Sequence, residues 1–363
     1  MKLAVFSAKP YDKVYLTQAQ AAAELKPELG SDSSSSIELV YHDFALNPET
    51  VSLASSAEAV CVFVNDTLKA DVLASLHALG VRAILLRCAG YNNVDLKTAS
   101  DLGLFVANVP SYSPEAVAEF AVALVQTLNR NTHRAYNRVR EANFALDGLL
   151  GRTLHGKTVG IVGTGKIGVA FARIMQGFGC ELLAYDPFHN PDFDKYGRYT
   201  TLSELLSRAD VVSLHCPLLP STRHIINEET LREMKEGAML VNTSRGGLID
   251  TKAVIAALKR GHLGGLALDV YEKESRFFYN DHSGTIIDDD DLMRLTTFHN
   301  VLVCGHQAFF TEEALGEIAG ATFRNLADFV HGRECKNSLV QSSQEQGAAL
   351  TMRARSDTIP IRI

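Results

Sequence analysis

The 363-residue chain has few cysteines, no excess of positive charge and no long hydrophobic run. Its six cysteines are scattered and form no CxxC pair, so the sequence predicts neither a disulfide framework nor a zinc module. A net charge of −7 provides no basic surface for nucleic acid or for an anionic membrane. No apolar stretch approaches the roughly 20 residues of a membrane span. We therefore expect no nucleic-acid or membrane partner and no bound metal.

The first residues also lack the pattern of a secretion signal. An apolar run from Met1 to Phe6 is soon interrupted by Lys9 and Pro10, which leaves it too short for a signal peptide. A first β-strand is the better interpretation, and the reducing cytosol is the expected compartment. With 46% hydrophobic and 21% charged residues, the chain has the balance of a globular enzyme, and its length favours two domains.

Short apolar runs alternate with helical patterns along most of the chain. The runs are continuously apolar, as in parallel strands that are covered on both faces. Such alternation predicts right-handed βαβ units in doubly wound sheets. The expected strands are Leu3–Phe6, Val60–Val64, Ala83–Leu86, Phe105–Ala107, Val159–Val162, Leu182–Tyr185, Val211–Leu214, Met239–Val241, Leu266–Leu268 and Val301–Val303. The expected helices are Ala70–Leu79, Pro114–Arg140, Ile167–Phe178, Leu202–Ser207, Lys252–Arg260 and Glu312–Val330.

One predicted helix has almost no polar face. Ser113 and Pro114 suit its first turn, and the residues up to Val125 are nearly all apolar. Such a helix must be buried, either between domains or in a subunit interface. In contrast, the serine tract at Ser31–Ser36 predicts a surface loop, and Gln341–Ile363 predicts a flexible tail.

A glycine motif follows one of the apolar strands. Gly163-Thr164-Gly165-Lys166-Ile167-Gly168 has the form GxGxxG between Val159–Val162 and a helical pattern, which is typical of a dinucleotide-binding turn. The helix N-terminus would bind the pyrophosphate. Asp186 ends the next strand, 18 residues after Gly168, where an acid accepts hydrogen bonds from the ribose 2′-OH and repels a 2′-phosphate. The motif predicts NAD rather than NADP.

Three further strand ends carry an arginine, an acid and a histidine. Arg245 follows Met239–Val241, Glu274 follows Leu266–Leu268, and His306 follows Val301–Val303. Singly they could be an ion-pair partner, a solvated acid and a core histidine. Together, beside a nicotinamide site, they match the reduction of a 2-keto acid.

In that chemistry each of the three side chains has a distinct role. The arginine holds the substrate carboxylate by a bidentate pair. The histidine supplies a proton, and the acid favours and orients the imidazolium. His215 ends another strand, but Cys216-Pro217 follows it, and we interpret it as structural or cofactor-adjacent.

With these residues in place, the sequence resembles the D-isomer-specific 2-hydroxyacid dehydrogenases, and among them the fermentative D-lactate dehydrogenases, from Met1 to about Val340. The resemblance implies a discontinuous flavodoxin-like catalytic domain (1–112 and 299–340), an inserted Rossmann NAD domain (113–298) and a tail (341–363), with the active site in the cleft and a dimer or tetramer as the assembly. The segments that carry it are Leu86–Asp95, Pro110–Glu119, Gly163–Gly168, Ser213–Leu218, Asn242–Gly246, Asp269–Glu272 and Gly305–Phe309.

The resemblance also assigns roles by position. The family's catalytic residues fall on Arg245, Glu274 and His306. Its loop for the substrate carboxylate falls on Ala89 and Gly90. The remaining matches are two pocket aromatics, Tyr112 and Phe309, and a supporting acid, Asp269, which we count with the cofactor-binding residues.

Other functions remain open from sequence. The substrate could be glyoxylate, hydroxypyruvate, phenylpyruvate or a branched keto acid instead of pyruvate. Formate dehydrogenases are related but have glutamine where this chain has Glu274. A transcriptional corepressor of the C-terminal-binding-protein type would keep the fold and NAD binding, but the segments around Cys88–Asp95 and Gly305–Phe309 favour an enzyme.

Overall fold

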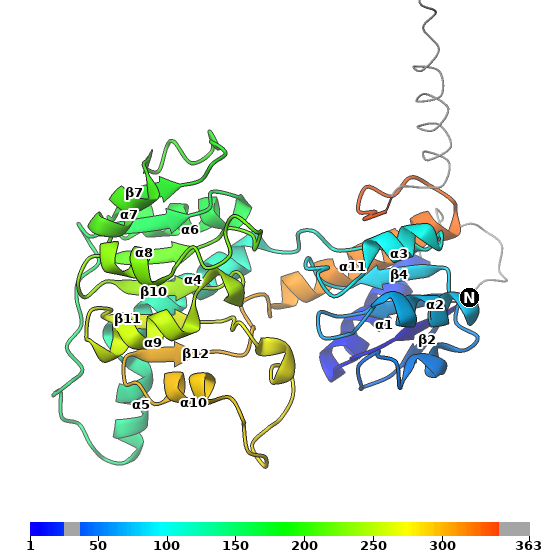
Figure 1. Ribbon diagram of the computed structural model, residues 1–363, viewed down its shortest axis with the longest axis horizontal. Coiled ribbons are helices and arrows are strands. Elements are labelled where there is room, and N and C mark those ends of the chain that lie inside the picture. Colours follow the sequence, from blue (N-terminus) through cyan, green and yellow to red (C-terminus); the bar gives the residue numbers. More distant parts are fainter. Residues whose placement is uncertain (25–36, 341–363) are drawn as a thin grey trace, which may run out of the picture. The chain divides into compact units, whose positions relative to one another are not determined.

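The computed structural model describes residues 1–24 and 37–340, and divides the chain into two compact units. Of the described residues, the smaller unit contains 1–24, 37–112 and 311–340, and the larger unit contains Ser113–Phe310 (Figure 1). The serine tract and the C-terminal tail lie outside the described residues. Among those described, no helix is long and apolar enough to cross a membrane.

The smaller unit has a five-stranded parallel sheet with strand order β2-β1-β3-β4-β5. This is the flavodoxin-like order. On one face, α1 and α11 pack together over a core that includes Leu3, Leu85 and Phe323. The elements are β1 (Lys2–Val5), α1 (Pro10–Glu24), β2 (Glu38–Tyr41), β3 (Ala59–Val62), α2 (Ala70–Ala78), β4 (Ala83–Leu86), α3 (Leu96–Asp101), β5 (Phe105–Ala107) and α11 (Glu312–Val330).

The larger unit has a seven-stranded parallel sheet with order β12-β11-β10-β9-β6-β7-β8. Counted from β6, this is the Rossmann order 3-2-1-4-5-6 with a seventh strand added. Its elements are α4 (Pro114–Arg130), α5 (Thr132–Arg140), β6 (Thr158–Val162), α6 (Lys166–Gly177), β7 (Glu181–Tyr185), β8 (Arg198–Tyr199), α7 (Leu202–Arg208), β9 (Val211–Leu214), α8 (Glu228–Glu233), β10 (Met239–Asn242), α9 (Thr251–Lys259), β11 (Gly265–Leu268), α10 (Asp290–Thr296) and β12 (Val301–Val303).

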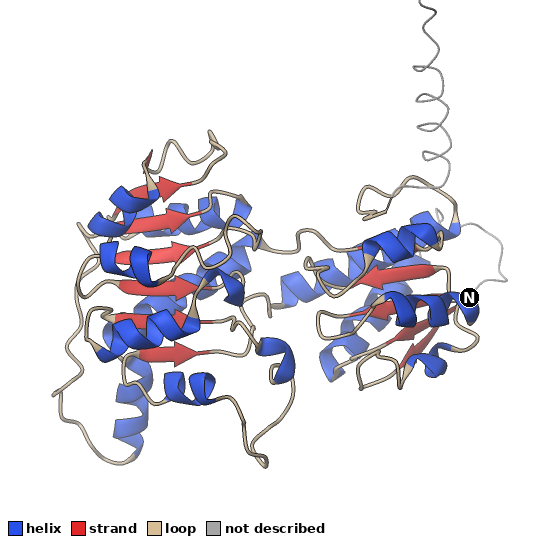
Figure 2. Ribbon diagram, viewed as in Figure 1, coloured by secondary structure: helices blue, strands red, loops and turns tan. Residues whose placement is uncertain are grey.

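Both faces of this sheet are covered, as Figure 2 shows. One hydrophobic core lies under α7, α8, α9 and α10, and includes Leu206, Leu240 and Leu292. The other lies under α4 and α6, and includes Val125 and Phe171. Covered faces explain why the strands are continuously apolar, and the predicted pair of doubly wound parallel sheets is confirmed.

Two expectations about the larger unit need correction. The predicted helix Pro114–Arg140 is two helices, because Asn131 adopts a left-handed conformation (φ 52°) that ends α4. The chain returns to the smaller unit after Phe310 rather than near His299, because β12 pairs with β11 and so belongs to the larger sheet.

The apolar face of α4 is buried within its own unit. Ser113 caps the helix by accepting a hydrogen bond from the Ala116 amide at 3.1 Å. Val122 and Val125 belong to the core that α4 shares with α6. The burial predicted for this helix is therefore provided by its own chain.

Candidate active site

The carboxyl ends of five strands meet at one edge of the larger sheet. In the parallel register Val162 of β6 stands opposite Leu214, Leu214 opposite Asn242, and Asn242 opposite Leu268. Leu268 in turn stands opposite Val303 of β12. Ligands of open α/β sheets bind beyond this edge, and every site residue predicted in the larger unit follows one of these strand ends or that of β7.

The glycine loop after β6 is shaped by close backbone packing. Gly163 has φ 98°, and a Cβ there would stand 2.6 Å from the Cys216 amide nitrogen. A Cβ on Gly168 would overlap the carbonyl oxygen of Gly163, so α6 can begin this close only with glycine. Gly165, by contrast, faces open space and gives α6 an N-cap without a side-chain hydrogen bond. The first turn of α6 is thus open to an anion, which fits the pyrophosphate of NAD.

Hydrogen bonds tie this loop to the end of β7. One carboxylate oxygen of Asp186 accepts from the Thr164 amide at 2.7 Å and from the Thr164 hydroxyl at 3.1 Å. Tyr199 donates to the same hydroxyl at 2.8 Å, and the Asn190 side chain donates to the Thr164 carbonyl at 2.7 Å. Asp186 is therefore held against the glycine loop. Of the other loop residues, Lys166 is exposed and Ile167 packs on the core under α6.

The histidine and the acid predicted at strand ends form a hydrogen-bonded pair. His306 Nδ1 and Glu274 Oε1 are 2.9 Å apart, and both side chains are largely but not fully buried. The other oxygen of Glu274 accepts from the Tyr271 amide at 2.9 Å, which fixes the carboxylate. Because Glu274 occupies Nδ1, Nε2 is the imidazole atom left to exchange a proton with a ligand.

A buried acid supports the loop that carries this histidine. Asp269 is fully buried, and its two oxygens accept from the Gln307 and Ala308 amides at 2.8 Å each. Burial raises the pKa of this carboxyl group. The cofactor contact that we expect for Asp269 stays a prediction. Phe309, next along this loop, is buried.

Arg245 lies on the loop after β10, and β10 stands between β6, which the glycine loop follows, and β12, which the His306 loop follows. Its carbonyl accepts from the Asn242 side chain at 2.9 Å, and its guanidinium donates to the Ser244 carbonyl at 2.7 Å. A Cβ on Gly246 would overlap the carbonyl carbon of Tyr271, so glycine lets this loop approach the segment that carries Glu274. Arg245, Glu274 and His306 therefore follow three adjacent strand ends whose loops pack on one another.

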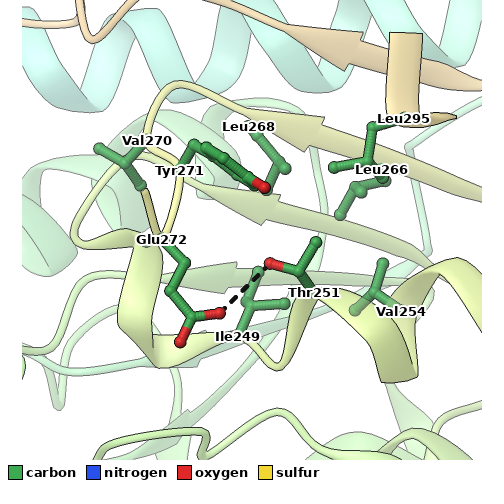
Figure 3. Close-up of a pocket in the computed structure, with 10 residues that line it drawn as sticks. Ile249, Thr251, Val254, Leu266, Leu268, Val270, Tyr271, Glu272 and Leu295 are labelled. Carbon is green, nitrogen blue, oxygen red and sulfur yellow. Dashed lines mark hydrogen bonds between the residues drawn. The ribbon is translucent and has the colours of Figure 1, made fainter. Parts of the chain in front are cut away.

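A small pocket is lined mainly by residues of β11, of α9 and of the segments that follow β10 and β11 (Figure 3). Glu272 borders it, accepting from His224 at 2.8 Å, from Arg223 at 3.1 Å and from Thr251 at 3.5 Å. The rest of the lining is mainly apolar, so the pocket lacks the donors that a keto acid requires. Its lining residues are Gly246, Ile249, Thr251, Val254, Leu266, Leu268, Val270, Tyr271, Glu272 and Leu295.

His215 lies in a different environment from His306. It packs against Phe171, and its Nε2 is 2.9 Å from the Ser213 hydroxyl. Desolvation lowers the pKa of the partly buried His215 to about 3, so this imidazole is neutral at physiological pH. A neutral, partly buried histidine supports the structural interpretation and does not suit a proton donor.

Three predicted substrate residues belong to the smaller unit. Ala89 and Gly90 follow β4, and their carbonyls accept from the Asn108 side chain at 2.8 Å and from the Cys88 thiol at 3.2 Å. Tyr112 is the last residue before the chain enters the larger unit. Their part in binding substrate stays a prediction.

Sequence reasoning missed Tyr279, Asn190 and Tyr199, which contact His306 or Thr164. Tyr279 and Asn190 lie in loops and Tyr199 in a two-residue strand, where neither motif nor periodicity marks a position. Among the described residues, no cluster of three or more histidine, cysteine, aspartate or glutamate side chains could hold a metal ion.

Comparison with known proteins identifies the arrangement. Residues 122–308 match the model of the D-isomer specific 2-hydroxyacid dehydrogenase NAD-binding domain. The chain belongs to the D-isomer specific 2-hydroxyacid dehydrogenase family. As a member of this family it is an oxidoreductase that uses NAD, and the Rossmann unit described above is the family's NAD-binding domain.

Individual relatives match nearly the whole length of this dehydrogenase and support the same family. It is 67% identical to 2-hydroxyacid dehydrogenase A of Aspergillus oryzae, over 94% of this chain and 96% of that protein. It is 65% identical to D-lactate dehydrogenase kk1H of Curvularia clavata, over 96% of this chain and 97% of that protein. The solved apo-structure of D-lactate dehydrogenase from Escherichia coli is 49% identical, with a TM-score of 0.84, and the match covers 94% of this chain and 100% of that one.

Proposed function

We propose that this dehydrogenase reduces pyruvate, or a close 2-keto acid, to the D-hydroxy acid. The observation that carries the proposal is the 2.9 Å pair between His306 and Glu274, beside the Arg245 loop at the edge where the cofactor motif lies. The similarity to D-lactate dehydrogenases supports pyruvate as the substrate. Because all six cysteines are free thiols, we place the activity in a reducing compartment, the cytosol.

Each polar residue has one task in the reduction. The glycine loop Gly163–Gly168 would hold NADH, which would supply the hydride to the carbonyl carbon. The Arg245 guanidinium binds the substrate carboxylate and polarises the adjacent carbonyl, and His306 donates the proton that converts the carbonyl oxygen to a hydroxyl. Glu274 holds the imidazole by Nδ1 and stabilises its protonated form. In the reverse direction, neutral His306 accepts the hydroxyl proton.

The remaining contacts set the orientation of substrate and cofactor. The amides of Ala89 and Gly90 would bind the substrate carboxylate, and Tyr112 and Phe309 would limit the size of the pocket. Asp186, fixed by Thr164, would accept from the ribose 2′-OH, and its charge disfavours NADP.

A panel of keto acids tests the proposal directly. We expect NADH oxidation to be fastest with pyruvate, ahead of glyoxylate, hydroxypyruvate, phenylpyruvate and branched keto acids, and chiral analysis to find the D product. Absence of turnover with every acid would support an NAD-binding corepressor instead. Faster turnover of a bulkier acid would move the proposal to that substrate.

Replacing His306 by Ala should reduce turnover by roughly 10²–10⁴-fold and leave NADH binding intact. Glu274→Gln should also lower turnover, because the charged hydrogen bond that holds Nδ1 of His306 is replaced by a weaker neutral one. Exposed His299, replaced by Ala, serves as the control. Wild-type turnover in His306→Ala would assign the proton to another group.

Replacing Arg245 by Lys keeps the charge but loses the planar fork that matches a carboxylate. We expect kcat/KM for the keto acid to fall roughly 10- to 100-fold, the equivalent of one charged hydrogen bond, with NADH affinity unchanged. Exposed Arg260→Lys is the matched control. Steady-state kinetics and NADH fluorescence titration measure both quantities. Wild-type kinetics in Arg245→Lys would show that the carboxylate is bound elsewhere.

We also propose that the protein is a homo-oligomer. Its interface would be formed by α5 and the loop that follows it, residues 132–150, which we call the arm (Figure 1). α5 buries no residue, and the arm exposes Phe144, Leu146 and Leu150 by 73%, 82% and 95%. Arg138 donates to the Asp147 carbonyl at 2.7 Å and so holds the loop against the helix. A fixed surface with this much apolar area suits a second copy of the chain.

The double variant Leu146→Asp/Leu150→Asp should dissociate the oligomer, because it puts charge on the apolar surface that the copies would share. Both side chains are exposed, so the folded protomer should persist, unlike a variant of Val122, which is buried within its own unit. Light scattering at micromolar concentration measures the mass, with Val14→Asp on α1 as the control. A monomeric wild type would contradict the proposal.

A further inference from the structure

Tyr279 lies at the end of a turn that begins at the catalytic acid. The Phe277 and Phe278 amides both donate to the Glu274 carbonyl, at 2.9 and 2.8 Å, and Phe277 is buried. These contacts close a turn between Glu274 and Tyr279. The two side chains can therefore contact one partner from the two ends of a single turn.

That partner is His306. While Glu274 holds Nδ1 of its imidazole, the Tyr279 hydroxyl donates to the His306 carbonyl at 3.3 Å. The Tyr279 ring also lies against the imidazole, with centroids 5.9 Å apart and planes 35° apart. The segment from Glu274 to Tyr279 thus contacts Nδ1, the ring and the backbone carbonyl of His306.

The backbone contact matters because His306 has a left-handed conformation, with φ 58°. This conformation is uncommon outside glycine, although histidine adopts it more readily than most residues, and contacts around the backbone help to hold it. The peptide group between His306 and Gln307 receives that support at both ends. Its N–H donates to Asp269 at 2.8 Å, and its carbonyl accepts from Tyr279. Two hydrogen bonds in opposite directions fix the plane of this peptide, and with it the direction of the histidine side chain.

We propose that Tyr279 is a positioning residue, which aims His306 Nε2 at the carbonyl oxygen of the substrate. The inference rests on the proposed role of His306 as proton donor. The hydroxyl acts on the backbone of His306, and the ring limits rotation of the imidazole. Tyr279 therefore contributes to proton transfer through His306 rather than to binding of the keto acid.

Two substitutions separate the hydroxyl from the ring. Tyr279→Phe keeps the ring and loses one neutral hydrogen bond, so kcat for the keto acid should fall about 2- to 10-fold. Tyr279→Ala removes both contacts, and kcat should fall about 10- to 100-fold. KM for the keto acid and the Kd of NADH should change little in both variants. The solvent deuterium isotope effect on kcat should rise, because proton transfer becomes more rate-limiting.

A double variant tests whether Tyr279 acts through His306. On the His306→Ala background, Tyr279→Ala should cause no further loss of the residual rate. Ile286→Ala, on the same loop and 97% exposed, is the control for loop effects. Circular dichroism checks the fold, and Tyr279→Phe keeps the test decisive where the alanine variant is unstable.

Three results would overturn the inference: wild-type kcat in Tyr279→Ala, a rise in KM alone with an unchanged isotope effect, or an additive loss in the double variant. A wild-type rate in His306→Ala would instead refute the proposed proton donor, so the two failures are distinguishable.

Discussion

The site depends on one buried carboxylate. Asp269 has no solvent exposure, and a charge there is tolerated only with donors close at hand. The donors are the amides of Gln307 and Ala308, so the acid fixes the course of the chain immediately after His306. Without those two hydrogen bonds, the left-handed backbone of His306 would keep only the support of Tyr279. The geometry of His306 is therefore set by an acid that follows a neighbouring strand.

Backbone contacts also fix the other loops at this edge of the sheet. Glu274 is tied to the Tyr271 amide before it contacts His306. Gly246 brings the Arg245 loop against Tyr271, and Gly163 brings the cofactor loop against Cys216. Each functional loop rests on the loop beside it. Close approach of backbones, possible only at glycine, converts the regular spacing of parallel strands into a compact set of functional groups.

The sequence predicts this edge well because its signals are strong. Covered parallel strands are continuously apolar, and GxGxxG, Arg245, Glu274 and His306 each follow such a strand. Two strands escaped prediction for the opposite reason: β2 is a partly exposed edge strand, and β8 has only two residues. The break at Asn131 escaped because the helical pattern continues on both sides, and one left-handed residue leaves no periodic signal.

Among the long-range hydrogen bonds, the sequence predicts the pair of Glu274 with His306 but not the contact of Tyr279 with His306. Tyr279 and His306 are separated by 27 residues, and only the turn at Glu274 brings them together. The sequence predicts the second crossing between the units near His299, which is too early in the chain. The apolar pattern of β12 does not indicate which sheet it joins, and only its pairing with β11 assigns it to the larger unit.

The insertion of one unit within the other also has a consequence for biosynthesis. Residues 113–310 leave the ribosome as one continuous stretch that contains its complete sheet, whereas the first 112 residues emerge without α11. That helix supplies Ala319, Phe323 and Leu326 to the core around Leu3 and Leu85. Since domains fold as units when their chain is available, the first unit to be translated is the last to complete its core. Until Thr311 and the residues after it emerge, the core around Leu3 and Leu85 lacks the apolar side chains of α11 and is covered only in part.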